Sequence, residues 1–307
     1  MKLLFAGTSD FAVTILESLL SEGFDIKCVI CQPDRPKGRK KLLTPCPVKL
    51  AAEARGLTLF QPEAISDSES VAYISSFDAD AFAVAAYGQK IPLSLLELTP
   101  LGAINVHGSL LPALRGAAPI QRSIMSGLCK TGVTTMLMNE GMDTGDILLS
   151  RETPIEADDN SETLGKRLAV LGAELLVETL YARAAGTLTP VKQDDALATK
   201  APSIKKADTI IDFSLSARKV CCLIRGLAPR PGAVCTLFDT EIKVTEAHIK
   251  EEDAPHTDCG SVLSFGKQGI EAACGRGSVM ITRLQPAGGK EMEAAAFANR
   301  FKQFKRQ

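Results

Sequence analysis

The first 190 or so residues alternate short apolar runs with helical patterns. The runs Lys2–Ala6, Ile26–Cys31 and Ala81–Gly88 are apolar at nearly every position, which is typical of strands that are buried on both faces. Between the first two runs, the stretch that opens at Asp10 carries an apolar residue every three or four positions, as an amphipathic helix does. Strands and helices in this alternation predict an α/β fold with a doubly wound, mostly parallel sheet.

A long apolar stripe closes this first pattern. Ser161 is suited to cap a helix, and leucines then recur at helical spacing as far as Gly186. The stretch after Gly186 is polar, contains prolines and shows no sustained apolar period, so we interpret it as a linker. The predicted organisation is a catalytic domain at 1–189, a linker at 190–206 and a C-terminal domain at 207–307.

The last hundred residues change to an all-β pattern. A brief helical stretch at Ala217–Leu223 precedes five short runs rich in apolar and β-branched residues, separated by turn residues. These runs are Ala233–Phe238, Ile242–Ile249, Gly260–Phe265, Gly269–Cys274 and Ser278–Leu284. About five short strands at this spacing predict a small antiparallel barrel, although spacing alone does not select the kind of barrel.

Chain length and composition fit a two-domain protein and indicate the cellular compartment in which it works. The chain has 307 residues, more than a single core usually holds. Its nine cysteines have no framework spacing, which favours free thiols in a reducing cytoplasm. Cys28 and Cys31 have CxxC spacing, but a strand sends positions three apart to opposite faces, so we predict core thiols. With a strand expected from Lys2 and no apolar run near 18 residues, neither a targeting segment nor a membrane span is expected.

Charge is nearly balanced overall but concentrated locally. The net charge is −1, with an acidic excess before residue 205 and a basic excess after it. One short run carries five basic residues in seven positions. These residues are Arg35, Lys37, Arg39, Lys40 and Lys41. Proline and glycine interrupt the run, which excludes a helix or a central strand. A solvated loop and a nucleic-acid contact both remain open on the charge pattern alone.

Nucleotide-cofactor motifs are not among the sequence's features. The turn after the first strand reads Gly7-Thr-Ser-Asp10, which is not GxGxxG, and the chain has no Walker motif. Binding of a dinucleotide or nucleotide cofactor therefore loses support.

The strongest chemical signal lies where another apolar strand ends. Asn105 and His107 are two residues apart in the run Leu101–His107, so they point to the same face, roughly 6.6 Å apart. Gly108 and Pro112 then turn the chain away at the sheet's carboxyl edge, where open α/β sheets bind ligands. Each polar side chain alone has an ordinary structural explanation. Two within one apolar run carry a desolvation cost that indicates a partner or a function.

A carboxylate follows one more strand. The run Val133–Met138 ends in a turn-rich stretch that contains Asp143, which is placed to reach His107. A carboxylate beside an imidazole stabilises its protonated form, and an amide N–H donates to a developing oxyanion. Asn105, His107 and Asp143 together suit attack by a neutral amine on an activated carbonyl. No serine or cysteine nucleophile is required.

The same residues carry a family resemblance. The segments Asn105-Val-His107-Gly-Ser109-Leu-Leu-Pro112, Arg115-Gly-Ala-Ala-Pro-Ile120 and Asp143-Thr-Gly-Asp146 resemble the signature of folate-dependent formyltransferases. A single NxH would be weak, whereas these paired motifs at this separation are highly specific. The resemblance extends from end to end of the chain. Within the family, the chain most resembles the members that act on methionyl-tRNA.

The resemblance implies a substrate pair and roles for residues. Formyl transfer would run from 10-formyltetrahydrofolate to the amino group of methionine on initiator methionyl-tRNA, in the cytoplasm, by a monomer without a metal. Asn105, His107 and Asp143 would be catalytic, and the basic run from Arg35 to Lys41 would bind tRNA. The C-terminal domain would be an OB-like barrel that also binds tRNA. Folate would be bordered by Ser109, Leu110, Leu111 and Pro112.

Two departures and two alternatives accompany this resemblance. Ala113 and Leu114 stand where family members often have a basic residue and an aromatic, and Lys200 stands where an aromatic is common. One alternative is a formyltransferase for a small amine such as a sugar nucleotide or a purine precursor. The other is a non-catalytic RNA-binding protein, which folate-dependent turnover would exclude.

Overall fold

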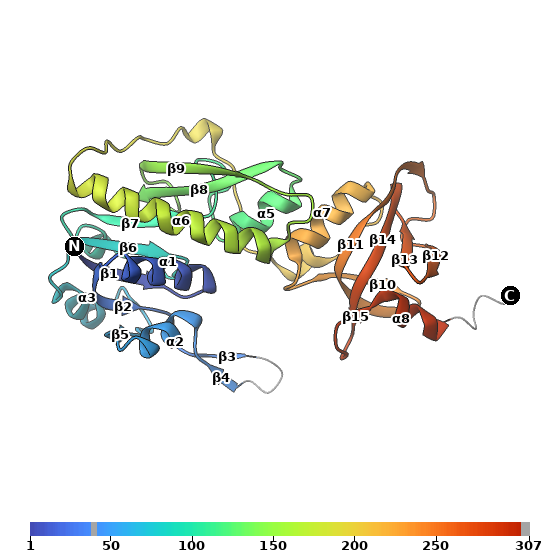
Figure 1. Cartoon of the computed structure of the whole chain (residues 1–307), viewed down its shortest axis with the longest axis horizontal. Coiled ribbons are helices and arrows are strands. Elements are labelled where there is room, and N and C mark those ends of the chain that lie inside the picture. The colour runs from blue at the N-terminus through green and yellow to red at the C-terminus, as the bar shows by residue number, and fades with distance from the viewer. Residues whose placement is uncertain (38–41, 302–307) are drawn as a thin grey trace. The chain divides into compact units, whose positions relative to one another are not determined.

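The computed structural model describes residues 1–37 and 42–301, which form two compact units (Figure 1). The first unit comprises Met1–Gly116, Thr131–Thr153 and Gly165–Lys200. The second comprises Ala117–Lys130, Pro154–Leu164 and Ala201–Gln307. The predicted boundaries of the catalytic domain, linker and C-terminal domain stay a prediction.

A seven-stranded sheet forms the centre of the first unit, in the order β5-β2-β1-β6-β7-β8-β9. Its strands are β1 (Lys2–Gly7), β2 (Asp25–Ile30), β5 (Leu59–Phe60), β6 (Ala81–Ala85), β7 (Ala103–His107), β8 (Lys130–Leu137) and β9 (Ile147–Pro154). The pairs from β5 to β7 are parallel, and β7 pairs with β8 in the antiparallel sense. The prediction of a mostly parallel sheet is therefore confirmed.

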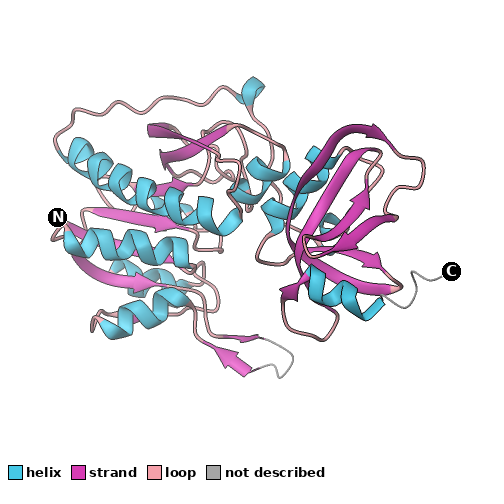
Figure 2. Cartoon of the chain, turned by 45° about the vertical axis from the view of Figure 1, so that its right-hand side comes forward, coloured by secondary structure: helices cyan, strands magenta, loops and turns pink. Residues whose placement is uncertain are grey.

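Helices cover both faces of this sheet, as the alternation of elements predicts (Figure 2). They are α1 (Asp10–Ser21), α2 (Pro47–Ala54), α3 (Ser68–Ser75), α4 (Leu93–Leu96) and α6 (Ser161–Ala184). One apolar cluster joins the sheet to side chains of α1, α2 and α6, and a second joins it to side chains of α3 and α4. Successive β1 residues alternate between the two clusters, because side chains of a strand point to opposite faces.

The start of α6 differs in detail from the sequence prediction. Asn160, rather than Ser161, caps the helix: its side-chain oxygen accepts hydrogen bonds from the backbone N–H groups of Glu162 and Thr163. The hydroxyl of Ser161 instead donates to the carbonyl of Ala228. Asparagine caps a helix as well as serine does, so the sequence prediction placed the cap one residue too late.

The basic run lies partly in a short hairpin. Strand β3 (Arg35–Lys37) pairs with β4 (Leu42–Thr44) as a separate two-stranded sheet. The run is thus neither helical over Arg35–Lys37 nor part of the central sheet. Arg39, Lys40 and Lys41 lie outside the described residues.

The polar stretch after α6 makes regular contacts within the first unit. Val191 and Ile147 exchange two backbone hydrogen bonds of 2.8 Å at the edge strand β9. A 3-10 turn, η1, follows at Asp195–Leu197, and Lys200 then forms a parallel bridge with Arg115. We name residues 191–200 the strap. It is polar because it satisfies backbone groups of its neighbours, which explains its lack of an apolar period.

The second unit combines an antiparallel sheet with short helices. Its strands are β10 (Ala233–Leu237), β11 (Thr240–Pro255), β12 (Val262–Gly266), β13 (Gly269–Ala273), β14 (Arg276–Pro286) and β15 (Met292–Glu293). The order is β10-β11-β14-β13-β12, and β15 pairs with β14. Register shifts along the β11–β14 pair mark bulges, which bend strands. The predicted antiparallel β fold is confirmed.

One apolar cluster fills this second unit. The helices are α5 (Pro119–Met125), η2 (Lys206–Thr209), α7 (Ala217–Leu227) and α8 (Ala294–Ala298). Side chains of α7 and α8 pack with the inner positions of β10, β11, β13 and β14. Helix α7 continues for one turn beyond the predicted Ala217–Leu223, because Ile224 and Leu227 extend its buried face.

All nine cysteines are free, as predicted. Cys28 and Cys31 are both buried, and they belong to the two clusters on opposite faces of the sheet. Burial raises the pKa of the Cys28 thiol to about 12. Within the described residues, no helix is long and apolar enough to cross a membrane.

Candidate functional site

The site is built around the carboxyl end of β7, which presents Asn105 and His107 on one face. Asn105 pairs in register with Val84 of β6 and with Met136 of β8, and His107 pairs with Thr134. Strands on both sides therefore fix the backbone of Asn105, and β8 fixes that of His107, before any ligand arrives.

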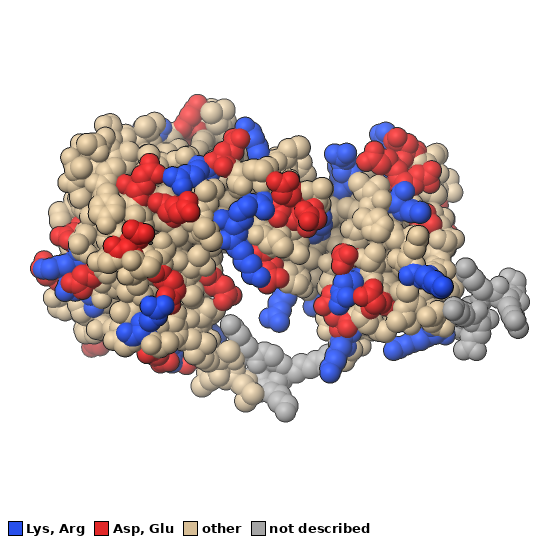
Figure 3. Space-filling view, viewed as in Figure 1, with Lys and Arg blue, Asp and Glu red and all other residues tan. Residues whose placement is uncertain are grey.

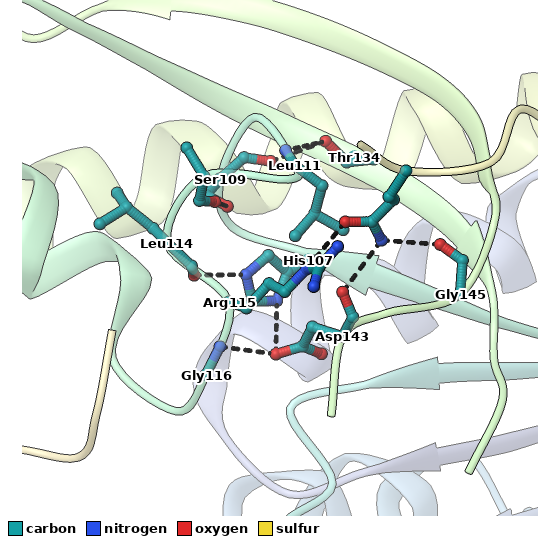
Figure 4. Close-up of polar contacts among 11 residues, drawn as sticks. His107, Ser109, Leu111, Leu114, Arg115, Gly116, Thr134, Asp143 and Gly145 are labelled. Carbon is teal, nitrogen blue, oxygen red and sulfur yellow. Dashed lines mark hydrogen bonds and ion pairs between the residues drawn. The ribbon is translucent and has the colours of Figure 1, made fainter. Parts of the chain in front are cut away.

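His107 is buried and lies between two oxygen atoms (Figure 4). It is 5% exposed. Its Nε2 lies 3.0 Å from the carbonyl oxygen of Leu114, and its Nδ1 lies 3.7 Å from Oδ2 of Asp143. A carbonyl oxygen only accepts, so Nε2 carries the hydrogen and Nδ1 is the nitrogen that can take up a proton. The resulting imidazolium would face the Asp143 carboxylate.

Asp143 is held by the backbone of a neighbouring loop. Its Oδ2 accepts a hydrogen bond of 2.7 Å from the N–H of Gly116. The side chain of Asp143 is 15% exposed, so water screens its charge weakly and its interaction with His107 is stronger than at an open surface. Asp143 also has a φ of +54°, a left-handed conformation that is uncommon outside glycine and that aspartate adopts more readily than most other residues.

The Asn105 side chain differs from its neighbours, because it is only partly buried. Among residues 1–37 and 42–301, none forms a hydrogen bond or ion pair with the side-chain amide of Asn105. The amide N–H donors are thus available to a substrate at the same sheet edge as His107. This is the arrangement that stabilisation of an oxyanion requires.

The loop after β7 is fastened to β8. Thr134 of β8 donates its hydroxyl to the carbonyl of Ser109 at 2.7 Å and accepts the N–H of Leu111 at 3.1 Å. The Ser109 hydroxyl donates to the carbonyl of Ala113 at 2.6 Å, so this candidate folate contact supports its own loop. Leu110 packs so closely on β8 that a Cβ at Gly132 would lie 2.5 Å from its Cδ2.

The other candidate folate contacts of this loop are buried or partly buried. Leu111 is 6% exposed, and Leu110 and Pro112 are partly buried.

Among the residues that the structure describes, no group of three or more His, Cys, Asp or Glu side chains is placed to hold a metal ion.

The structure describes only part of the candidate tRNA-binding run. Arg35 is exposed, and its guanidinium pairs with Glu63 at 3.0 Å. Lys37 ends β3, and Arg39, Lys40 and Lys41 lie outside the described residues. Elsewhere, Lys and Arg are interspersed with Asp and Glu on the face of the molecule shown in Figure 3.

Three residues around His107 have no role in the sequence prediction. Leu114 contributes its backbone carbonyl, Gly116 contributes its backbone N–H, and Gln193 from the strap hydrogen-bonds the turn that carries Asp143. A backbone contact has no sequence signal. Because Leu114 acts through its carbonyl, its departure from the common family residue leaves this contact unaffected.

Comparison with known proteins decides the family. A family model described as formyl transferase matches residues 1–180, and one described as formyl transferase, C-terminal domain, matches residues 203–302. The chain belongs to the formyl transferase family. It is 45% identical to a methionyl-tRNA formyltransferase of Citrifermentans bemidjiense over 98% of this chain and 94% of that protein. A methionyl-tRNA formyltransferase of Geotalea uraniireducens is 45% identical over 98% and 96% of the two chains.

Solved structures of more distant proteins share the fold of this formyl transferase. HypX from Aquifex aeolicus in complex with tetrahydrofolic acid has a TM-score of 0.66 at 15% identity, covering 98% of this chain and 47% of HypX. The N-formyltransferase from Helicobacter canadensis, in complex with folinic acid and dTDP-3-aminofucose, has a TM-score of 0.67 at 18% identity over 92% and 98% of the two chains. At these identities the likeness concerns the fold alone.

Proposed function

We propose that this formyl transferase moves the formyl group of 10-formyltetrahydrofolate to the amino group of methionine on initiator methionyl-tRNA, for translation initiation. The near full-length identity to methionyl-tRNA formyltransferases supports this choice of acceptor. The observation that carries the chemistry is the open side-chain amide of Asn105 on the same strand face as buried His107, which pairs with the partly buried Asp143.

The proposed reaction is direct transfer between the two bound substrates. The neutral amine of methionine attacks the formyl carbon, and a new C–N bond forms while the bond from that carbon to the nitrogen of the folate breaks. One proton leaves the attacking amine and one reaches the departing nitrogen, so protons and charge balance. The site has to stabilise negative charge on the formyl oxygen and to move that proton.

Each candidate residue has a matching role. Asn105 donates its amide N–H to the formyl oxygen as negative charge develops there. His107 accepts the proton of the amine at Nδ1, since Nε2 already donates to Leu114. Asp143 stabilises the imidazolium and is itself held by Gly116. Both His107 and Asp143 are shielded from solvent, which strengthens this charge pairing.

Substrate capture is assigned to residues around and beyond this pair. Ser109, Leu110, Leu111 and Pro112 border the folate. The basic run from Arg35 to Lys41 contacts tRNA phosphates, assisted by a C-terminal domain at 207–307 that follows the linker 190–206. Exposed basic side chains of the second unit include Lys206, Lys219, Arg230, Lys250, Lys267 and Lys290. The enzyme acts in the cytoplasm as a monomer. Sedimentation of the purified protein at working concentration tests the monomeric state.

The decisive experiment offers purified protein 10-formyltetrahydrofolate together with initiator methionyl-tRNA or, separately, with an amino-sugar nucleotide or a small ribonucleotide amine. Formyl-methionyl-tRNA is the expected product, with kcat/KM for the small amines lower by roughly 10³-fold or more, because they make no phosphate-backbone contacts. Preferential formylation of a small amine would contradict the proposed acceptor. Absence of any folate-dependent transfer would favour a binding protein.

A further inference from the structure

Gln193 is a buried polar residue whose side chain reaches the catalytic turn from the strap. It is 6% exposed. Its Nε2 donates to the carbonyl of Asp143 at 2.9 Å and to the carbonyl of Gly145 at 2.7 Å, and its Oε1 accepts from Nε of Arg115 at 3.0 Å. One side-chain amide thus joins the turn that carries Asp143 to the loop that carries Arg115.

The Asp143 turn has a conformation that needs external support. The positive φ of Asp143 is uncommon for a residue other than glycine, and surrounding contacts help to hold it. Gly145 lies so close to the end of β8 that a Cβ there would be 1.6 Å from the carbonyl oxygen of Leu137, so only glycine fits at this position. The two hydrogen bonds from Gln193 bracket this stretch at both ends.

The strap supports the other contact of His107 as well. Thr199 accepts the N–H of Leu114 at its hydroxyl, 2.8 Å away, and the N–H of Arg115 at its carbonyl, 2.9 Å away. The carbonyl of Leu114 is the acceptor for Nε2 of His107. Both oxygen atoms that face the imidazole are therefore backed by residues of the strap.

We propose that Gln193 is a positioning residue that holds Asp143 opposite His107. This inference rests on the proposed function of that pair. Gln193 acts through Asp143 and does not touch the substrates. Loss of its two donors releases the turn, lets Asp143 relax from its left-handed conformation and moves the carboxylate away from Nδ1. A shift of about 1 Å in a catalytic group lowers the rate by up to roughly 10²-fold.

Two variants of Gln193 and one matched control test this role. Gln193→Ala removes all three hydrogen bonds, and Gln193→Glu keeps the shape but turns a carboxylate oxygen toward two carbonyl oxygens. Both should lower the single-turnover rate roughly 10-fold or more, with KM for each substrate changed by less than about 2-fold. The control Asp195→Ala removes an 81% exposed strap partner of Arg115 and leaves Gln193 in place. Its rate should stay within about 2-fold of the wild type.

A double-mutant cycle with Asp143→Asn separates positioning from general support of the fold. If Gln193 acts through Asp143, Gln193→Ala should cost less than about 2-fold more once the carboxylate is gone. A full, additive loss in that background, or a near-native rate in both single Gln193 variants, would overturn the inference. If Gln193→Ala does not fold, Gln193→Glu completes the cycle.

The same cycle distinguishes failure of the inference from failure of the proposed site. If Asp143→Asn alone keeps the wild-type rate, the role of Asp143 is wrong and the role of Gln193 is overturned with it. If Asp143→Asn is slow while the Gln193 variants are fast or additive, only the positioning role is overturned.

Discussion

Two regions of the first unit are equally buried but are held together by different forces. Around β1, Leu3, Leu4, Phe5 and Ala6 have no exposed surface and belong to the two apolar clusters of the sheet. Around His107, the buried residues are polar and each makes directional hydrogen bonds to a backbone group or a neighbouring side chain. They are His107, Ser109, Thr134 and Gln193. The volumes of apolar side chains determine the packing of the first region. The geometry of hydrogen-bond donors and acceptors determines the arrangement of the second.

This difference separates stability from chemistry. Apolar packing contributes to stability roughly in proportion to buried area and has no direction. Hydrogen bonds contribute little net stability but fix atoms within a few tenths of an ångström. We therefore expect changes around β1 to lower the free energy of unfolding while the folded enzyme stays active. Changes around His107 should mainly slow formyl transfer, with a smaller loss of stability.

The largest effect is expected for Phe5→Ala. Phe5 is among the largest fully buried side chains, so its removal leaves a cavity and should lower the free energy of unfolding by about 3–5 kcal/mol. Denaturant unfolding measures this loss. The kcat of the folded fraction, assayed well below the new midpoint, should stay within about 2-fold. A stable variant with a lost kcat would remove the distinction between the two regions.

Asn105→Ala and His107→Ala should mainly slow the reaction, with smaller losses of stability than Phe5→Ala. Each should slow formyl transfer by roughly 10²-fold or more, equivalent to about 2.7 kcal/mol of transition-state stabilisation. Asn105→Ala should leave the free energy of unfolding unchanged within about 1 kcal/mol, since its amide has no partner among the described residues. His107→Ala should lower it by about 1–3 kcal/mol, because the carbonyl of Leu114 loses its donor. Near-native turnover in both variants would contradict the site.

The two regions also differ in how well the sequence predicted them. The apolar strands β1, β2 and β6 follow from continuous apolar runs, because a parallel sheet covered on both faces needs little else. Asn105 and His107 follow from the period of two along β7, and the nearness of Asp143 follows from a turn after the adjacent strand. These inferences use short-range patterns that a sequence displays directly.

The parts that the sequence did not predict depend on distant or backbone contacts. Gln193 meets Asp143 across 50 residues, and Leu114 contributes a carbonyl that every residue type has. The sequence of the strap shows no apolar period, because its polar groups form hydrogen bonds with neighbouring segments. Helix α5, only seven residues long, begins with proline and has too few turns for a clear apolar period. Such contacts become visible only when the fold brings the segments together.

A smaller effect is expected from the basic run. Replacing Arg39, Lys40 and Lys41 with alanine should weaken use of methionyl-tRNA and reduce its dependence on salt by up to roughly three counterions per binding event, with folate binding little changed. Initial rates at several salt concentrations measure the slope. Arg55→Ala serves as a control, because Arg55 pairs with Glu17 on α1. Equal slopes for wild type and triple variant would return the run to a solvated loop.

The smallest effect concerns the thiols. Cys129 and Cys259 are exposed and should react with iodoacetamide at neutral pH, whereas buried Cys28, Cys221 and Cys235 should react only on unfolding. Burial raises the pKa of each of these three thiols to about 12, so thiolate is scarce below that pH in the folded state. Mass spectrometry of the alkylated protein identifies the sites. Early labelling of Cys28 would show that the β1 core opens.

Asp143→Asn tests the catalytic site most directly, because asparagine keeps the shape and can still accept the N–H of Gly116 while it removes the negative charge beside His107. The measurement is the single-turnover rate of formyl-methionyl-tRNA formation with both substrates saturating, alongside the midpoint of thermal unfolding. We predict a rate lower by roughly 10²-fold at an unchanged midpoint. A rate within about 2-fold of the wild type at the same midpoint would contradict it.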